Sequence, residues 1–311
     1  MRPWRVPYPK FGAGPGLERV TRVAQRLGVD LAGFGAAGAV IVGSNGKGST
    51  AAMTAALLQQ AGRSVGLFTS PHLFDLNERF RIDGDDIADE ELQRHWSRVT
   101  EAAAAEGLAE QLGGFEFLFL IAADWFAARR CAHTVWEAGI GGRLDPVRLI
   151  EAQRVALTAL DLEHTELLGA TLEEIARDKI DAAPRGARVF APGDIAVRDA
   201  VEAHCAEKAV GLVFVAPALA SPLPGAFQRN NAALAIALAR DLAPLSDAQL
   251  ARGFVATRWP GRLEVIESAP LMVIDVGHTP AGVRAALAGF RDLAGARDAT
   301  LVCGVSADKD A

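Results

Sequence analysis

The sequence is poor in cysteine, in clustered charge and in long apolar runs, and each shortage excludes a class of protein. Its three cysteines, Cys131, Cys205 and Cys303, lie far apart without a CxxC spacing, so neither a disulfide framework nor a zinc site is expected. The formal net charge is −6 and no block of like charge occurs, which argues against a nucleic-acid-binding surface. No stretch reaches the roughly 18 apolar residues of a membrane span, and the first residues lack a signal-peptide core. We therefore expect a cytoplasmic protein that binds small molecules, and no membrane or nucleic acid.

The apolar residues that are present alternate between strand-like and helix-like patterns along most of the chain. Short buried strands are expected at 36–43, 64–70, 133–142, 154–162, 187–193 and 210–217. Helices are expected at 17–28, 50–62, 91–107, 117–130, 171–183, 230–242 and 244–254. Strands that alternate with helices pair in parallel through crossover helices, which predicts an α/β fold with a doubly wound, mostly parallel sheet. Binding sites are then expected at the carboxyl ends of the strands.

The pattern restarts near Trp259. Segments 271–293 and 300–311 repeat strand, loop and helix, as though a new α/β unit begins there. Residues 259–311 are fewer than the about 100 to 150 residues of an ordinary domain. We therefore expect an ATP-binding domain at 1–258, followed by the beginning of a second α/β domain at 259–311 in a truncated chain.

The stretch GSNGKGST at 43–50 follows an expected strand and precedes an expected helix. A phosphate loop needs a strand to deliver it, glycines that let backbone amides converge, a lysine, and a helix whose amino end faces the anion. The candidate nucleotide-binding residues are Gly43, Asn45, Gly46, Lys47, Gly48 and Ser49. Gly48 stands where a hydroxyl residue normally follows the lysine, so a tight turn with a solvated lysine is the alternative interpretation.

Eight further segments agree with a single family in order and approximate spacing. They are TSPHLFDLNERFRIDG (69–84), EAGIGGRLD (137–145), LTALDLEHTELLG (157–169), ARDK (176–179), NAALA (231–235), PGRLE (260–264), DVGHTP (275–280) and ADKD (307–310). Together with the glycine-rich loop, these segments resemble the signature segments of folylpolyglutamate synthase and dihydrofolate synthase, enzymes of the Mur ligase superfamily. The resemblance implies a ligase that uses ATP and two Mg²⁺ ions to join glutamate to dihydropteroate or a folate through an acyl phosphate, and that acts as a monomer.

The resemblance also assigns roles around the magnesium ion. Lys47 would neutralise the γ-phosphate, because phosphoryl transfer depends mainly on positioning and charge neutralisation. Ser70, Glu137 and His164 would hold the ion, and His164 would belong to the catalytic group. An ionised carboxylate such as Glu137 at the end of a buried strand is costly without a partner, and a cation is a natural one. In isolation, Ser70 is equally well read as a turn hydroxyl and His164 as an ordinary, partly exposed histidine.

Lys179 corresponds to a catalytic lysine that is carbamylated in related ligases and helps hold a second Mg²⁺. Reaction with carbon dioxide requires a neutral amine, so the site must lower the pKa of Lys179. A solvated helical lysine is the alternative, and Ile180 to Ala183 replace the glycine-containing stretch that usually follows.

Nucleotide contacts from the other side of the site are implied for Asn231, Arg262, Asp275 and His278. Arg262 is also compatible with an interdomain salt bridge. The family generally has alanine at the position of Gly277 and asparagine at that of Thr279.

The pterin side of the substrate is expected near residues 11–20 and the loop at 69–80. Phe74 would cover a flat heteroaromatic ring. Alternatively, Leu73, Phe74 and Leu76 only pin the loop to the core.

Two other functions stay open. A Mur-type peptide ligase that acts on another carboxylate is disfavoured, because residues 1–42 are too few for the nucleotide-sugar domain that precedes the phosphate loop in such enzymes. A nucleotide-binding homologue without ligase activity is supported by the incomplete second domain and by two departures, although truncation of the chain explains the incomplete domain more simply. Glu163 stands where the family has aspartate, and Pro146-Val147 replace a threonine-asparagine pair.

Overall fold

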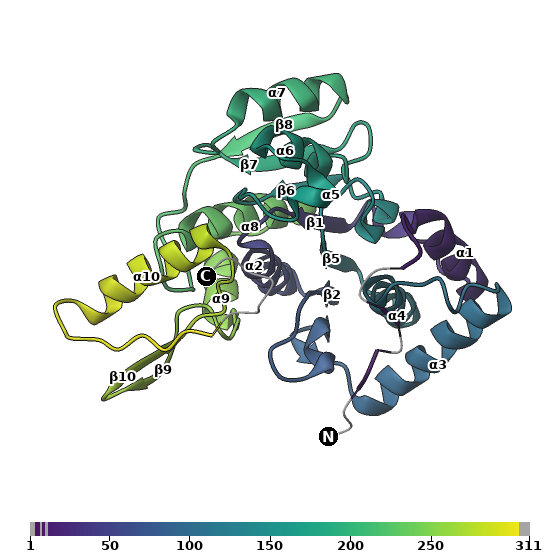
Figure 1. Cartoon of the computed structure of the whole chain (residues 1–311), viewed down its shortest axis with the longest axis horizontal. Helices are drawn as coiled ribbons and strands as arrows, with labels where there is room; N and C mark the ends of the chain where they lie inside the picture. Colours follow the sequence, from purple (N-terminus) through teal and green to yellow (C-terminus); the bar gives the residue numbers. More distant parts are fainter. Residues whose placement is uncertain (1–3, 7, 10–11, 305–311) are drawn as a thin grey trace.

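The computed structural model describes residues 4–6, 8–9 and 12–304, which form an α/β fold around an eight-stranded sheet (Figure 1). The strands lie in the order β4-β3-β2-β5-β1-β6-β7-β8. Six of them pair in parallel: β1 (Gly38–Val42), β2 (Val65–Phe68), β5 (His133–Glu137), β6 (Arg154–Leu157), β7 (Arg188–Pro192) and β8 (Gly211–Val215). The short strands β3 (Phe80–Ile82) and β4 (Asp85–Asp86) add an antiparallel edge beside β2. The predicted doubly wound, mostly parallel sheet is confirmed.

Helices cover both faces of this sheet. One face packs on α2 (Lys47–Gln59), α8 (Gln228–Leu242) and α9 (Asp247–Ala256). The other packs on α1 (Leu17–Leu27), α3 (Asp89–Ala105), α4 (Gly114–Arg129), α6 (Leu172–Ile180) and α7 (Arg198–Glu207). The remaining short helices are η1 (Ala32–Phe34), η2 (Leu76–Arg79), η3 (Pro146–Ile150) and α5 (Thr165–Leu168).

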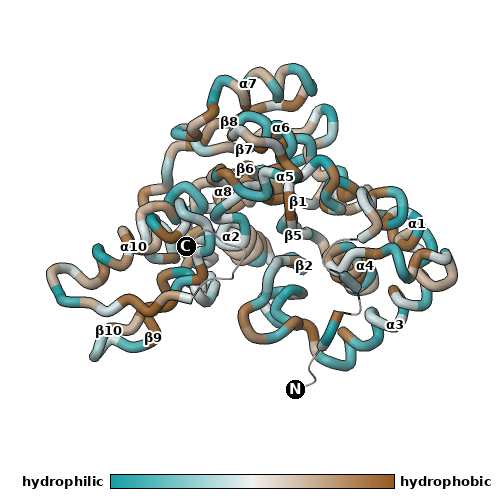
Figure 2. Tube along the Cα trace, viewed as in Figure 1, coloured by the Kyte–Doolittle hydropathy of each residue, from teal (hydrophilic) through white to brown (hydrophobic). Residues whose placement is uncertain are grey.

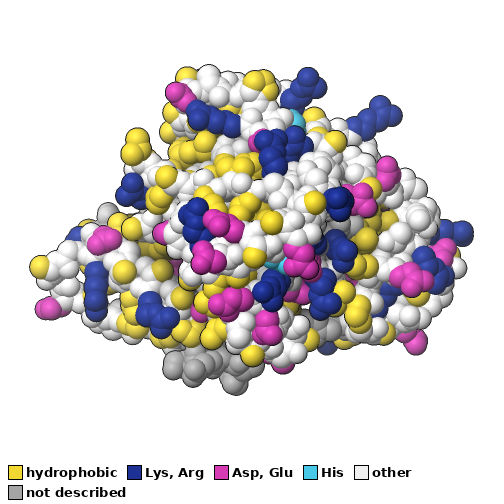
Figure 3. Space-filling model, turned by 90° about the horizontal axis from the view of Figure 1, so that it is seen from above, with side chains coloured by type: hydrophobic (Ala, Val, Ile, Leu, Met, Phe, Trp, Pro, Cys, Tyr) yellow, Lys and Arg dark blue, Asp and Glu magenta, His cyan; other side chains and the backbone are white. Residues whose placement is uncertain are grey.

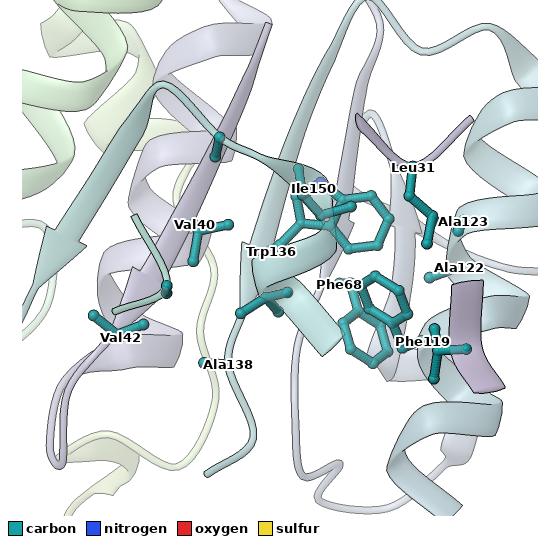
Figure 4. Packing of buried hydrophobic residues seen from close by; sticks show 14 of the residues in the cluster. Leu31, Val40, Val42, Phe68, Phe119, Ala122, Ala123, Trp136, Ala138 and Ile150 are labelled. Carbon is teal, nitrogen blue, oxygen red and sulfur yellow. The ribbon is translucent and has the colours of Figure 1, made fainter. Parts of the chain in front are cut away.

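Strand β1 shows why both faces need a cover. Val40 and Val42 belong to the core beneath α4, whereas Ala39 and Ile41 belong to the core beneath α2, and all four are fully buried. An unbroken apolar strand is typical of a parallel sheet buried on both sides. Figure 4 shows Val40 and Val42 in the core beneath α4, together with Trp136. In Figure 2 the hydrophobic colouring follows central strands such as β1 and β6.

The C-terminal part of the described chain is an antiparallel pair, β9 (Glu264–Ser268) and β10 (Leu271–Ile274), followed by α10 (Pro280–Ala294). These elements lie together beside α9 (Figure 1). The prediction of a strand at the start of 300–311 is wrong for residues 300–304. These residues are irregular, and Leu301 and Val302 are exposed. Among the described residues no neighbouring strand pairs with this segment. The motif ADKD at 307–310 lies outside the described residues.

The surface is mixed in charge. On the face shown in Figure 3, basic and acidic side chains are interspersed. None of the described helices carries an apolar stretch long enough to cross a lipid bilayer.

Candidate functional site

The glycine-rich loop connects β1 to α2, as predicted. Backbone conformation and close packing explain why two of its positions are glycine. Gly43 and Gly46 have φ values of +146° and +90°, which favour glycine. A Cβ atom on Gly43 would overlap Thr158 Oγ1, and one on Gly46 would overlap Asn231 Oδ1. The loop is therefore pressed against β6 and α8, and it leads directly into the amino end of α2, where backbone N–H groups favour an anion.

Two lysines from different helices converge on one carbonyl of this loop. Lys47 Nζ donates to Gly43 O at 2.9 Å and to Ser44 O at 3.3 Å, and Lys179 Nζ donates to Gly43 O at 3.0 Å. Lys179 is 1% exposed. Burial, reinforced by the nearby Lys47 ammonium, lowers the pKa of Lys179. The structure thus brings together the two lysines that the sequence placed in the site.

Glu163 completes this cluster, although the sequence marked it only as a departure from the family. Its Oε1 lies 3.0 Å from Lys179 Nζ in an almost fully buried ion pair. Burial alone raises the pKa of Glu163, but Lys179 and Lys47 outweigh it, so the pKa lies below its usual value. Glu163 therefore stays ionised and favours the charged form of Lys179.

Glu137 and Ser70 lie next to each other at the carboxyl ends of β5 and β2. Glu137 is 4% exposed, and its Oε2 accepts a hydrogen bond from the Ser70 backbone N–H at 2.9 Å. Burial raises the pKa of Glu137, while Lys47, the Ser70 N–H and Arg262 oppose that rise. Glu137 is thus a buried acid surrounded by positive charge, within electrostatic reach of Lys47.

These residues fit a magnesium ion in part. Mg²⁺ uses one or two protein carboxylates and keeps waters or substrate phosphates in its shell, and the buried Glu137 carboxylate beside Ser70 supplies the kind of donor it needs. His164 lies at the N-cap of α5, where its Nδ1 is 4.0 Å from Glu166 Oε1. Within the described part of the chain, no three His, Cys, Asp or Glu side chains are grouped as a self-sufficient metal site. Any ion here would depend on the nucleotide for further ligands.

Helix α8 reaches the phosphate loop through a residue that the sequence analysis missed. Asn231 Nδ2 donates to Gln228 Oε1 at 2.8 Å, and Gln228 Nε2 donates to Ser49 Oγ at 3.3 Å. Gln228 is fully buried. The predicted residues Asn231 and Ser49 are thereby linked through Gln228, which stands three residues before Asn231 on the same face of α8.

The C-terminal part also touches the phosphate loop. Thr279, the N-cap of α10, donates from its Oγ1 to Asn45 Oδ1 at 3.0 Å. The predicted nucleotide residue Asp275 instead accepts from the backbone N–H groups of Leu263 and Gly277 at 3.0 and 2.7 Å. Asp275 therefore holds the turn that presents Arg262.

A cleft of about 90 Å³ separates the loop after β2 from the linker between α9 and β9. Its lining residues are Thr69, Pro71, Leu73, Glu78, Arg81, Trp259, Pro260, Arg262, Val276 and His278. Two of the predicted nucleotide residues, Arg262 and His278, therefore face the segment that carries Ser70.

The loop expected on the pterin side is held by its own acidic residue. Glu78 accepts from the backbone N–H groups of Leu73, Phe74 and Asp75 at 2.8 to 2.9 Å. Leu76 is 5% exposed and does pin the loop to the core, whereas Phe74 is 84% exposed. The alternative interpretation is therefore correct for Leu76 and wrong for Phe74.

The other expected pterin segment, 11–20, is described from residue 12. Arg19 donates to Glu116 of α4 at 2.7 and 2.8 Å and to Gly14 O at 2.7 Å. This buried arginine fixes the glycine-rich stretch against α4.

Comparisons with known proteins agree with these features. Residues 261–311 match the family described as Mur ligase, glutamate ligase domain. The chain is 32% identical to the dihydrofolate synthase/folylpolyglutamate synthase of Bacillus subtilis, over 91% of this chain and 73% of that protein. It is 35% identical to a probable bifunctional folylpolyglutamate synthase/dihydropteroate synthase of Halobacterium salinarum, over 87% of this chain. The chain spans only 37% of that relative's length.

Solved structures show the same fold. An FPGS-AMPPCP-folate complex superposes with a TM-score of 0.85 at 29% identity, covering 92% of this chain and 78% of the other. A bifunctional folylpolyglutamate synthase/dihydrofolate synthase with Mn, AMPPNP and L-glutamate bound gives a TM-score of 0.80 at 29% identity, covering 90% and 71%.

Proposed function

The chain belongs to the folylpolyglutamate synthase and dihydrofolate synthase family of the Mur ligase superfamily, and on this premise we propose that it is an ATP-dependent ligase. In this proposal it adds L-glutamate to dihydropteroate, to a folyl-polyglutamate, or to both. The observation that carries it is the convergence of Lys47 and Lys179 on the phosphate loop beside the buried acid Glu137. The relatives' complexes with AMPPCP, folate, Mn and L-glutamate support the substrate class.

The residues divide the work of carboxylate activation. The α2 amino end and Lys47 would hold the β- and γ-phosphates, so that the substrate carboxylate attacks a neutralised γ-phosphate to give an acyl phosphate and ADP. The amine of glutamate then attacks the acyl carbon and releases phosphate. A magnesium ion held by Glu137, Ser70 and His164 would supply further charge neutralisation. Arg262 would hold phosphate oxygens from the linker side of the cleft.

Lys179 has two possible states in this proposal. A carbamate on its Nζ, with a second Mg²⁺, is what the family resemblance implies, and the lowered pKa of Lys179 supports the reactivity of the amine. The ion pair with Glu163 favours the ammonium instead. Carbamylation therefore requires Glu163 to leave Lys179.

The remaining proposals concern organisation. We place the domain boundary between residues 258 and 259, supported by the match to the Mur ligase domain from residue 261 and by the start of β9 at Glu264. The family resemblance implies a monomer, which gel filtration tests, and the sequence predicts a cytoplasmic protein, which cell fractionation tests.

A coupled ADP-release assay tests the function. ADP release should require both glutamate and a pterin acid, and comparison of dihydropteroate with tetrahydrofolate identifies the acceptor. The Lys47→Met variant should lose turnover, because the γ-phosphate loses its neutralising charge. ATP binding without ADP release under all these conditions would refute ligation and favour a nucleotide-binding homologue.

A further inference from the structure

Trp259 covers the phosphate loop from the linker between α9 and β9. A Cβ atom on Gly48 would lie 2.8 Å from Trp259 Cζ2 and 3.3 Å from its Nε1. The edge of the indole ring that carries the N–H group therefore rests on the first turn of α2. Arg81 lies over the same ring, with its guanidinium carbon 5.3 Å from the ring centroid.

This contact explains the unusual residue at position 48. In the common phosphate loop, a serine or threonine follows the lysine, and its hydroxyl reaches the magnesium ion beside the phosphates. Here the indole edge occupies the space of that side chain, so only glycine fits. The linker thus places a different polar group, an N–H, where the loop would otherwise carry a hydroxyl.

That N–H group has no partner in the part of the chain that the structure describes. Trp259 Nε1 is buried and makes no hydrogen bond among the described residues. The same is true of Nε of Arg262, another linker residue that lines the cleft. The indole nitrogens of Trp4, Trp125 and Trp136, by contrast, donate to protein oxygens. A buried donor without an acceptor is energetically unfavourable, and an indole nitrogen can only donate.

We propose that the indole N–H of Trp259 donates a hydrogen bond to a phosphate oxygen of the bound nucleotide. The amino end of α2 is where such an oxygen is favoured, and Nε1 lies against the first turn of that helix. Trp259 is then a nucleotide-binding residue that ties the start of the C-terminal part to the phosphates. This inference rests on the proposed function for the identity of the ligand.

The test compares Trp259→Phe with Trp125→Phe by calorimetric titration with a non-hydrolysable ATP analogue and Mg²⁺. Phenylalanine keeps a ring over Gly48 but removes the N–H. A hydrogen bond to a charged group contributes about 1.5 kcal/mol or more, so Trp259→Phe should weaken binding about tenfold or more. Trp125 donates to Glu91, away from the phosphate loop, so its replacement should leave affinity unchanged. Equal affinity of Trp259→Phe and the native protein would overturn the inference.

A second measurement follows nucleotide binding in the native protein, and the substitution serves only to assign one resonance. The chain has five tryptophans, and Trp259 packs against Gly48 of the phosphate loop. With ¹⁵N-labelled indole groups, one of the N–H resonances should move strongly on addition of ADP, and that resonance should be missing from Trp259→Phe. Nucleotide binding that leaves every indole resonance in place would overturn the inference alone. Absence of nucleotide binding in the native protein would instead overturn the proposed function.

Discussion

The buried pair between Glu163 and Lys179 offers the sharpest test of how the site is held together. Replacement of Glu163 by glutamine keeps the shape and one acceptor oxygen but removes the negative charge. The Lys179 side chain is 2% exposed and that of Glu163 13%, with the charged atoms 3.0 Å apart. Loss of one partner of a buried pair costs about 3 to 5 kcal/mol. Because the amide oxygen still accepts a hydrogen bond from Lys179, we expect a loss of about 3 kcal/mol in the free energy of unfolding at pH 7.

The pH dependence of this loss follows from the pKa of Lys179. Burial already lowers that pKa in the native protein, and removal of the Glu163 charge lowers it further. Between the lowered folded-state pKa and the unfolded value of about 10.4, the unfolded state binds more protons, so stability rises with pH. This rise is steeper in Glu163→Gln, because its Lys179 has the lower folded-state pKa. The difference in unfolding free energy between the native protein and Glu163→Gln should therefore shrink as the pH rises from 7 to 10.

Denaturant unfolding at several pH values measures this effect. Glu202→Gln is the matched control, because Glu202 pairs with Arg198 on the surface of α7 with its side chain 48% exposed. Such an exposed pair contributes about 0.3 to 0.5 kcal/mol. If Glu163→Gln costs no more than Glu202→Gln, or if its deficit grows with pH, the electrostatic account of the cluster is refuted.

The other predictions concern the phosphate loop and the buried acid Glu137. Gly46→Ala should destabilise the protein by about 2 to 3 kcal/mol and weaken nucleotide binding. Alanine is strained at the positive φ of this position, and its Cβ would overlap the Asn231 side chain. Gly62→Ala, at φ +72° with open space around it, should cost only the strain of about 1 kcal/mol, and equal losses in denaturant unfolding would contradict the packing argument. Glu137→Gln should reduce ADP release at least about a hundredfold. Without metal it should raise the melting temperature at pH 8, because burial raises the pKa of Glu137 and its ionisation destabilises the folded state as the pH rises through that pKa. A variant that melts lower than the native protein at pH 8 would show that the acid is stabilised by its neighbours.

The fold was predictable because its signals are local. A buried strand, a glycine-rich turn and a helix beginning at Lys47 are adjacent in sequence, and they form β1, the phosphate loop and α2. Burial of β1 on both faces produces the unbroken apolar run that indicates a parallel strand. The irregular segment at 300–304 shows the limit of such signals, since an apolar run becomes a strand only beside another strand.

The contacts inside the site could not be predicted in the same way, because they join residues far apart in the chain. Gln228 reaches Ser49 across 179 positions, and Thr279 reaches Asn45 across 234. A glutamine three residues before Asn231 is the available signal for the first contact, but its role depends on how α8 packs against α2. Glu163 and Lys179 are only 16 positions apart, but in the sequence Glu163 indicates a departure from the aspartate of the family, and nothing there marks Lys179 as its ion-pair partner.

The two glycines that flank Lys47 show why the sequence motif alone does not describe this site fully. From the sequence, Gly46 and Gly48 indicate backbone freedom around an anion. In the structure, each also makes room for a side chain from a distant element: Asn231 of α8 at Gly46 and Trp259 of the linker at Gly48. The phosphate loop is thus the point where α8, the linker and the amino end of α10 meet. A nucleotide bound there would contact all of them at once, so that its binding should stabilise the position of the C-terminal part against the sheet as well as the loop itself.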